Sequence, residues 1–231
     1  MMQRLDGILY DLDGTLLNVF PEYPARVLRQ TLEELHCEVS DNFVYRFWND
    51  PDREKMIVRE TGVNFDDFWK TFWKYDTPEA RRNNISICDD AQALETLRQL
   101  TSGKIKFGIV TKSLKEVAYA EVEVLRKRIP RVEFGSVVTN LYGTGYPDKP
   151  DPFPLELCLS ELGVRKDRAM YVGDNEEDKE LIRRSGIRGL IIDRGLKESP
   201  DLSDTPEIKK IRTLYEIEEL PGFFEAISHL G

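Results

Sequence analysis

Short apolar runs alternate with amphipathic segments over most of the chain, and this alternation predicts an α/β fold. The runs consist mainly of aliphatic and aromatic residues, as expected of strands buried on both faces. They lie at residues 8–10, 107–110, 137–138, 170–172 and 190–192, with helical patterns at residues 91–100, 113–128, 154–162 and 176–185. Since strands that alternate with helices form parallel sheets covered on both faces, we expect a doubly wound, mainly parallel sheet.

Particular residues mark the ends of these helical segments. Gly163 and Gly186 each follow a segment, at the position where a helix C-terminus favours glycine. At the start of segment 113–128, Ser113 and Glu116 have the capping-box spacing, which predicts that Ser113 caps the helix.

The middle of the chain, residues 19–87, has a different pattern with no convincing strand. One helical face is formed by Leu28, Leu32 and Leu35. Asp50-Pro51 has the character of a helix start. We therefore predict a small helical subdomain here, inserted into an α/β core made of residues 1–18 and 88–231.

Aromatic residues gather on one side of a helix within this insert. They recur at the spacing i, i+3, i+4, i+7 and i+8, which is typical of a single helical face. The residues are Phe65, Phe68, Trp69, Phe72 and Trp73. Because a large exposed apolar face is unfavourable, we expect it to pack inside the insert or against the core.

Polar groups follow four of the predicted strands, three of them directly at the strand end and one, residues 149–150, in the loop after residues 137–138. The groups are residues 11–15 (Asp-Leu-Asp-Gly-Thr), 111–113 (Thr-Lys-Ser), 149–150 (Lys-Pro) and 173–178 (Gly-Asp-Asn-Glu-Glu-Asp). Taken singly, each has an ordinary interpretation as a turn, a helix cap or a solvated charge. Because the carboxyl ends of parallel strands share one edge of the sheet, the four groups together predict a binding site there.

These residue types suit phosphoryl transfer. A phosphate monoester is dianionic and repels an attacking carboxylate, and Asp11, Asp13 and Asp174 offer the oxygen ligands with which Mg²⁺ would remove that repulsion. A carboxylate can also attack phosphorus and carry the phosphoryl group. Thr111 and Lys149 supply a hydroxyl and an ammonium for the phosphate oxygens as charge spreads in the transition state.

In order and spacing, the four groups resemble the four motifs of the haloacid dehalogenase superfamily, over nearly all of the chain outside the insert. The resemblance implies a Rossmann-like core and a phosphatase that works through an aspartyl-phosphate intermediate. It implies that Asp11 is the nucleophile and Asp13 the general acid/base. Thr111 would then hold a phosphoryl oxygen, and Lys149 would stabilise Asp11 and the phosphate.

The same resemblance implies the ligands of the metal and the substrate. Mg²⁺ would be held by Asp11, the backbone carbonyl of Asp13, and Asp174, with Asp178 as a ligand or as support. The substrate-binding residues would be Thr111, Lys112, Ser113 and Lys149.

The insert resembles the C1-type cap of the superfamily. We expect it to close over the site, exclude water and restrict the enzyme to small phosphorylated metabolites. Its hinges should lie near residues 17–18 and 87–90, where the chain leaves and re-enters the core. Five cations within it are candidates for contact with the substrate, but we favour their interpretation as exposed solubilising charges: Arg26, Lys70, Lys74, Arg81 and Arg82.

Other functions stay open. Phosphomutases of this superfamily usually have Val or Ile where this chain has Thr15, which favours hydrolysis. Dehalogenases lack the residue equivalent to Asp13, and a silent binding or regulatory member would have lost at least one motif residue. Lys112 in place of a common Asn, and Asn18-Val19 in place of a common Asp-Ser pair, argue against assignment to a named subfamily.

Composition narrows the class of protein. The 231 residues carry a formal net charge of −9, which argues against a broad surface for nucleic acid or membranes. With two histidines and no C-x-x-C pair, a zinc site is not expected, and Cys37, Cys88 and Cys158 are predicted to be free thiols. Neither a signal peptide nor a membrane-spanning stretch is found, so we expect a cytoplasmic protein, whose oligomeric state stays open.

Overall fold

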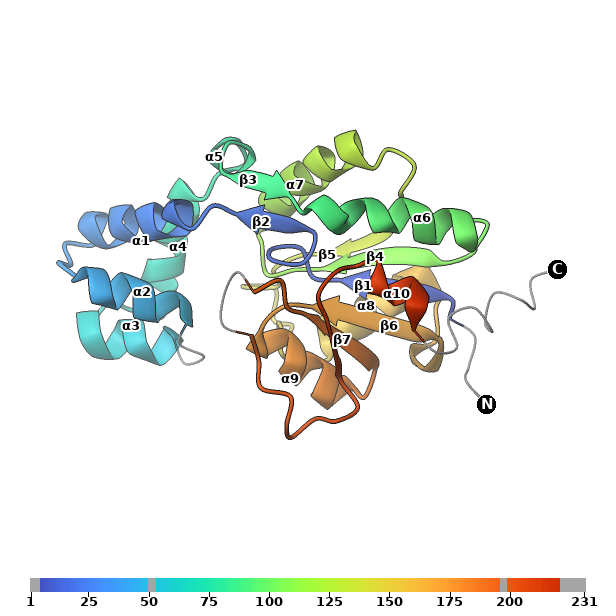
Figure 1. The fold of residues 1–231 in the computed structure, drawn as a ribbon. Coiled ribbons are helices and arrows are strands. Elements are labelled where there is room, and N and C mark those ends of the chain that lie inside the picture. Colours follow the sequence, from blue (N-terminus) through green and yellow to red (C-terminus); the bar gives the residue numbers. More distant parts are fainter. Residues whose placement is uncertain (1–4, 50–52, 196–198, 221–231) are drawn as a thin grey trace.

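The computed structural model describes residues 5–49, 53–195 and 199–220, and its centre is a six-stranded sheet (Figure 1). All neighbouring strands pair in parallel, in the order β5-β4-β1-β6-β7-β8. The strands are β1 (Gly7–Tyr10), β4 (Lys106–Val110), β5 (Phe134–Val138), β6 (Ala169–Gly173), β7 (Arg188–Ile192) and β8 (Lys209–Ile211). The five predicted core strands are present, and the short edge strand β8 is an addition that the pattern did not predict.

Helices cover both faces of the sheet, which confirms the doubly wound α/β prediction. They are η1 (Asp89–Gln92), α6 (Ala93–Leu100), α7 (Lys115–Arg128), α8 (Phe153–Leu162), η2 (Lys166–Arg168), α9 (Glu176–Ser185) and α10 (Glu216–Glu219). Side chains of β1 alternate between the faces. Ile8 and Tyr10 pack with residues of α6 and α7, whereas Leu9 packs with residues of α8 and α9. Gly163 and Gly186 end α8 and α9 in the left-handed conformation, as predicted.

The strand order reverses around β1. From β1 the chain builds β4 and β5 on one side of it, and then β6, β7 and β8 on the other. Such a reversal is where open α/β sheets bind ligands, at the carboxyl ends of the strands. In the register of the sheet, Tyr10 lies opposite both Ile109 and Val172. The residues that follow these three strands therefore emerge side by side.

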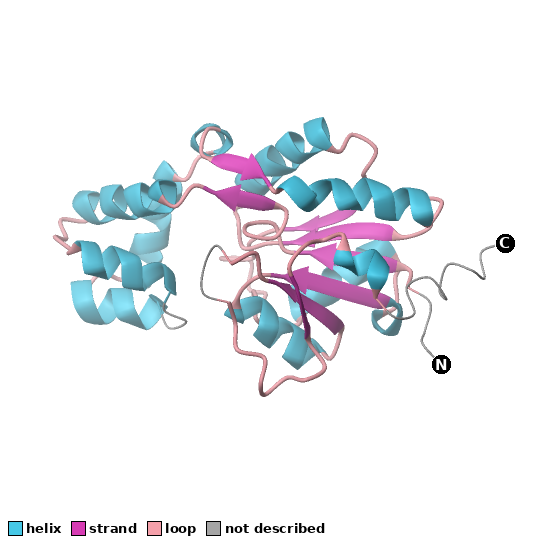
Figure 2. Cartoon of the chain, viewed as in Figure 1, coloured by secondary structure: helices cyan, strands magenta, loops and turns pink. Residues whose placement is uncertain are grey.

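A helical insert leaves the core between β1 and β4 (Figure 2). Its helices are α1 (Glu22–Glu34), α2 (Asp41–Asn49), α3 (Arg53–Thr61), α4 (Phe65–Tyr75) and α5 (Pro78–Arg82). Two antiparallel strands, β2 (Leu17–Val19) and β3 (Ile85–Ile87), join it to the core. The prediction of no strand in residues 19–87 is therefore wrong at the ends of that range, because strands of three residues show no readable alternation. The predicted helix start at Asp50-Pro51 lies outside the described residues.

The aromatic face of α4 fills the interior of the insert. Phe68 and Phe72 are buried in one cluster with Leu28 and Leu32 of α1. The other members of the predicted face, Phe65, Trp69 and Trp73, are partly buried around the same cluster. The prediction that this face is buried is confirmed, and it forms the insert's own core.

The start of α7 differs from the prediction. The helix begins at Lys115, and its N-cap residue, Leu114, makes no side-chain cap. Ser113 lies one residue earlier, and its hydroxyl donates to Oδ2 of Asp13 (3.2 Å). A hydrogen bond to a charged carboxylate is stronger than one to a backbone amide, so the hydroxyl faces Asp13 and not the helix.

The cysteines have the state predicted for them. Cys37, Cys88 and Cys158 are free. Burial raises the pKa of the Cys88 thiol to about 11 and that of Cys158 to about 12, so neither is a ready nucleophile. Over the described ranges, the helices are too short or too polar to cross a bilayer.

Candidate active site

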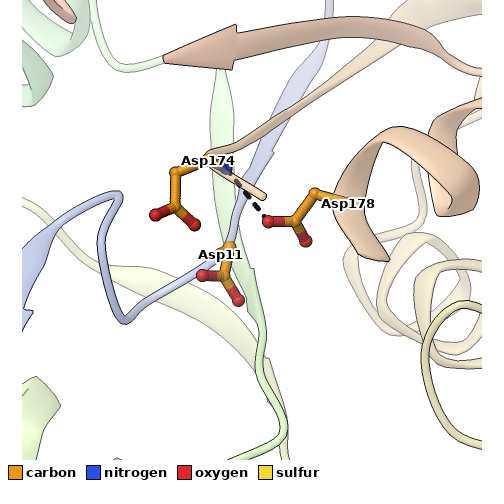
Figure 3. A group of neighbouring side chains, drawn as sticks. All are labelled: Asp11, Asp174 and Asp178. Atoms are coloured by element: carbon orange, nitrogen blue, oxygen red, sulfur yellow. Dashed lines mark hydrogen bonds between the residues drawn. The ribbon is translucent and has the colours of Figure 1, made fainter. Parts of the chain in front are cut away.

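Asp11 directly follows the central strand β1. Its backbone N–H donates to the carbonyl of Val172 in β6 (2.8 Å), which extends the sheet pairing by one residue and orients the side chain. The carboxylate is buried, and its Oδ1 lies 2.6 Å from Nζ of Lys149. Figure 3 shows this carboxylate facing those of Asp174 and Asp178, which come from the end of β6 and from α9.

Asp11, Asp174 and Asp178 form a buried acidic group. Each offers one carboxylate oxygen, and these oxygens lie within 4.8 Å of one another. The loop after β6 is held locally, because the Asp174 N–H donates to Oδ2 of Asp178 (3.0 Å). Asn175, the N-cap of α9, accepts from the Asp178 N–H (3.1 Å). Hard oxygen donors at this separation could hold a divalent metal ion.

Two glycines allow the backbone to approach this group closely. Gly14 has a φ of 87°, and a Cβ there would lie 1.9 Å from Oδ2 of Asp174. A Cβ on Gly173 would lie 2.3 Å from Cγ of Asp178. A side chain at either position would displace a carboxylate, so these glycines are required by the site and not by the turns alone.

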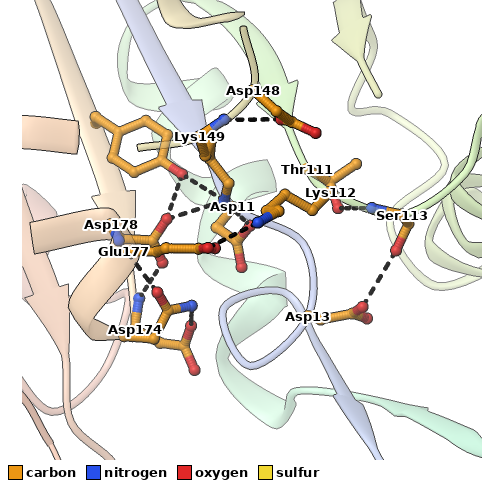
Figure 4. Close-up of polar contacts among 12 residues, drawn as sticks. Asp11, Asp13, Thr111, Lys112, Ser113, Asp148, Lys149, Asp174, Glu177 and Asp178 are labelled. Atoms are coloured by element: carbon orange, nitrogen blue, oxygen red, sulfur yellow. Dashed lines mark hydrogen bonds and ion pairs between the residues drawn. The ribbon is translucent and has the colours of Figure 1, made fainter. Parts of the chain in front are cut away.

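Lys149 bridges two of the three carboxylates. Its ammonium contacts both Asp178 and Asp11 (Figure 4). Nζ lies 3.0 Å from Oδ1 of Asp178 and 2.6 Å from Oδ1 of Asp11. The hydroxyl of Tyr171 donates to the same Asp178 oxygen (2.7 Å) and accepts from Lys149 (3.3 Å). Tyr171 is a member of this network that the sequence did not suggest. We call Asp11, Asp174, Asp178 and Lys149 the active cluster.

The charges of the active cluster do not balance by themselves. Burial raises the pKa of Asp11, Lys149 opposes this, and the nearby carboxylates of Asp178 and Asp174 raise it further. Burial lowers the pKa of the Lys149 ammonium, but the carboxylates of Asp11 and Asp178 outweigh burial and raise that pKa. A cation among the three carboxylates would act on Asp11 in the same direction as Lys149. The donor set, all oxygen and all buried, fits such an ion.

Residues 111–113 form the neighbouring wall of the site. The Thr111 N–H donates to the carbonyl of Val138 (2.9 Å), and its hydroxyl accepts from the Ser113 N–H (3.1 Å). Nζ of Lys112 lies 2.7 Å from Oε1 of Glu177 at the start of α9. Thr111 and Ser113 are buried, while Lys112 is partly exposed.

Asp13 lies beside this wall and faces the insert. Its Oδ2 accepts from the hydroxyl of Ser113 in the core and from Nη1 of Arg81 in α5 (3.1 Å). Figure 4 shows the Asp13 side chain next to Ser113 and apart from the Asp174 and Asp178 carboxylates.

Arg81 was interpreted as an exposed charge, and this prediction is wrong. Its side chain is only 11% exposed and contacts three carboxyl groups, one in the insert and two in the core. Nε and Nη2 donate to the two oxygens of Asp76 (3.0 and 2.8 Å), and Nη1 lies 3.4 Å from Oε1 of Glu121 in α7. Tyr23 of α1 also donates to Asp76 (2.7 Å). The other four cations, Arg26, Lys70, Lys74 and Arg82, are exposed as predicted.

We call Asp13, Asp76, Arg81 and Glu121 the junction cluster. Burial lowers the pKa of the Arg81 guanidinium, but the carboxylates of Asp13 and Asp76 outweigh burial and raise it. Burial raises the pKa of Glu121 to about 10, and the charge of Asp13 adds to this effect. Glu121 is therefore a neutral carboxyl group at pH 7.

Comparison with known proteins is consistent with this geometry. Residues 8–192 match the family model of haloacid dehalogenase-like hydrolases. The pyrophosphatase PpaX of Oceanobacillus iheyensis is 24% identical over 213 residues, which cover 92% of this chain and 92% of the relative. The N-acetylmuramic acid 6-phosphate phosphatase of Pseudomonas aeruginosa is 26% identical over 210 residues, which cover 83% of each chain.

Solved structures share the fold. A haloacid dehalogenase-like hydrolase from Bacteroides fragilis superposes with a TM-score of 0.73 at 20% identity, covering 93% of this chain and 100% of that one. CbbY from Rhodobacter sphaeroides, solved in complex with phosphate, superposes with a TM-score of 0.70 at 17% identity, covering 97% and 99%. At these identities the likeness concerns the fold alone, and the family follows from the family model. The chain therefore belongs to the haloacid dehalogenase-like hydrolases and is an enzyme of the phosphatase class.

Proposed function

We propose that the chain is a Mg²⁺-dependent phosphomonoester hydrolase that acts on small phosphorylated metabolites through a phosphorylated Asp11. The observation that carries this proposal is the active cluster: a buried carboxylate at the end of the central strand, 2.6 Å from a buried ammonium and grouped with two further carboxylates. A buried carboxylate that is already paired with a cation is preorganised to attack an anionic substrate.

The reaction has two steps. In the first, a carboxylate oxygen of Asp11 attacks phosphorus, the bond between phosphorus and the leaving oxygen breaks, and that oxygen takes a proton from Asp13. In the second, a water molecule gives a proton to Asp13 as its oxygen attacks phosphorus, and the bond to Asp11 breaks to release phosphate. Thr111 and Lys149 stabilise the phosphoryl oxygens in both steps, and the backbone and hydroxyl of Ser113 lie on the same wall.

The proposed ligands of Mg²⁺ are Asp11, Asp174 and the backbone carbonyl of Asp13. The ion would offset the repulsion between the substrate and the carboxylates. Asp178 is better suited to support than to direct ligation, because both its oxygens are already engaged. Oδ1 accepts from Lys149 and Tyr171, and Oδ2 accepts from the Asp174 N–H.

We further propose that residues 19–87 act as a cap on this edge of the core. Three contacts support this. Trp73 of α4 lies edge-to-face on Tyr142, in the loop that leads to Lys149, with ring centroids 4.9 Å apart, and Tyr142 also donates to Asp66. At the other side of the site, Arg53 of α3 lies 3.7 Å from Glu177. A cap held on both sides would exclude bulky substrates and water.

The experiment is a screen of the purified full chain against phosphorylated compounds, with Mg²⁺ and with a chelator. The panel should include pyrophosphate and N-acetylmuramic acid 6-phosphate, since relatives are named for these substrates, together with sugar phosphates, a phosphopeptide and an aryl phosphate. We expect Mg²⁺-dependent release of phosphate from small compounds and little from the phosphopeptide. Full activity after exhaustive chelation would contradict the proposed metal, and preference for the phosphopeptide would contradict the proposed cap.

A further inference from the structure

The junction cluster joins the insert to the candidate acid/base. We propose that Arg81 is a positioning residue, which holds the Asp13 carboxylate for proton transfer and makes its position depend on the helical insert. This inference rests on the proposed function in one respect, namely that Asp13 exchanges a proton with the leaving oxygen and with water.

The guanidinium of Arg81 is itself firmly placed within the insert. It makes a two-point contact with Asp76, which is the arrangement that best fixes a guanidinium in orientation. Asp76 is buried and also accepts from the hydroxyl of Tyr23, so α1, α5 and the end of α4 share one polar network. Nε and Nη2 are thereby committed to the insert, and Nη1 is left directed at the core.

On the core side, Nη1 meets two carboxyl groups. It donates to Oδ2 of Asp13 at 3.1 Å and lies 3.4 Å from Glu121, whose side chain is fully buried. Ser113 of the core donates to the same oxygen of Asp13 (3.2 Å). Asp13 is thus held between one donor of the core and one of the insert. A displacement of the insert would remove the second donor and leave the first.

A purely stabilising role does not account for this arrangement. Buried ion clusters are poor sources of stability, because removing each charge from water offsets most of the attraction. Arg81 contacts three carboxyl groups, and one of them, Asp13, has a side chain that is 33% exposed at the site edge. Orientation of a reactive group is a function that an ion cluster at this place can serve, and small errors of position are costly in catalysis.

The test uses leaving groups that differ in their need for a proton. An aryl phosphate with a nitro group releases a stable phenolate, whereas an alkyl phosphate requires protonation of its leaving oxygen. The value of kcat/KM reports steps up to cleavage of the ester, so it isolates the role of Asp13 as acid. For Arg81→Met, we expect kcat/KM to fall on the order of 10²-fold with the alkyl phosphate and by less than about threefold with the nitrophenyl phosphate.

A double-mutant cycle shows whether Arg81 acts through Asp13. If it does, adding Arg81→Met to Asp13→Asn should cause almost no further loss with the alkyl phosphate. Multiplied losses, or equal losses with both leaving groups, would overturn the inference and indicate a structural or direct substrate-binding role. The proposed function fails separately: in that case Asp13→Asn alone would show no dependence on the leaving group.

Three further variants control for misfolding and for the loss of the charge. Arg82→Met is the matched control, because Arg82 is the next residue of α5 and is exposed, and its Nη2 donates to the exposed Glu123 (3.1 Å). It should leave both rates unchanged. Should Arg81→Met alone fail to fold, Arg81→Met combined with Asp76→Asn removes the carboxylate that lost its partner, and the same selective loss is expected. Arg81→Lys should restore part of the alkyl phosphate rate, since it returns one donor.

Discussion

The molecule contains two clusters that each combine three carboxyl groups with one cation, and the two clusters offset their negative charge in different ways. The active cluster consists of Asp11, Asp174, Asp178 and Lys149. The junction cluster consists of Asp13, Asp76, Glu121 and Arg81. The first lies wholly in the core, and the second spans the core and the insert.

The difference lies in how each excess of negative charge is removed. In the junction cluster, burial raises the pKa of Glu121 to about 10, so one carboxyl keeps its proton and the cluster is closer to neutral without help. In the active cluster, Lys149 is shared by Asp11 and Asp178, and oxygens from three carboxylates converge. We infer that an ion from solution offsets the remaining charge of the active cluster, whereas a proton does so in the junction cluster. The active cluster is therefore suited to catalysis and the junction cluster to positioning.

The largest effect should come from the active cluster. Asp11→Asn replaces the nucleophile by an amide, which is a poor nucleophile and a weaker ligand for Mg²⁺, so turnover should fall by more than about 10³-fold. Steady-state hydrolysis of an aryl phosphate measures it. Asp41→Asn, at an exposed position of the insert, is the control and should be unaffected. An Asp11→Asn protein with the wild-type rate would remove the basis of the proposed mechanism.

Loss of Lys149 should be next in size. Lys149→Met removes an ammonium from Asp11 and from the phosphoryl oxygens, and the rate should fall on the order of 10²–10³-fold. Because Asp11 and Asp178 lose their partner, circular dichroism must first show that the variant is folded. Lys74→Met, an exposed position of the insert, provides the comparison. A loss below about threefold would mean that Lys149 serves only the structure.

Stabilisation of the folded protein by Mg²⁺ should depend on the active cluster and not on the junction cluster. At about one hundred times its dissociation constant, Mg²⁺ should stabilise the folded protein by about 2.7 kcal/mol, which raises Tm by roughly 5–10 °C in a chain of this size. The shift should disappear in Asp174→Asn and persist in Asp76→Asn, where the junction cluster is changed. Thermal unfolding with Mg²⁺, against NaCl of equal ionic strength, measures it. A shift retained in Asp174→Asn would place the ion elsewhere.

The last prediction concerns the proton of Glu121. Its pKa is raised from 4.5 to about 10, so between these values the folded protein holds a proton that the unfolded chain has released. Stability from this group is complete below about pH 4.5 and falls as the pH rises, by at most about 1.4 kcal/mol per pH unit. Glu121→Gln cannot titrate. Urea unfolding between pH 5 and pH 9 should show that the free energy of unfolding of the variant increases relative to that of the wild type as the pH rises. Parallel pH profiles of the two proteins would contradict a neutral Glu121.

The sequence predicted the active cluster because its members follow strands. Asp11, Lys149 and Asp174 lie in short groups after apolar runs, and parallel topology brings such groups to one edge whatever their separation along the chain. The alternation of strands and helices was equally readable, since it depends on local hydrophobic pattern. Tyr171 was hidden within an apolar run, although most buried hydroxyls are hydrogen-bonded, and here the hydroxyl donates to Asp178.

The junction cluster could not be predicted in the same way. Arg81 meets Asp13 only because β2 and β3 pair and because α5 packs on α7, and no local pattern encodes that docking. The position of Glu121 in the sequence did indicate an unusual carboxyl group. Glu121 lies on the helical face of Val117 and Leu125, both buried, and a carboxyl group on an apolar face must find a cation or keep a proton. It does both.

The most direct measurement is the capture of the intermediate. The full chain is mixed with substrate and Mg²⁺, quenched with acid within milliseconds, digested and examined by mass spectrometry. Asp13→Asn should be run in parallel, because loss of the base slows the second step and allows the intermediate to accumulate. The proposed mechanism predicts one phosphoryl group on the peptide that contains Asp11, and none in Asp11→Asn. Phosphate release with no phosphorylated peptide at any quench time, or a phosphoryl group on another residue, would contradict it.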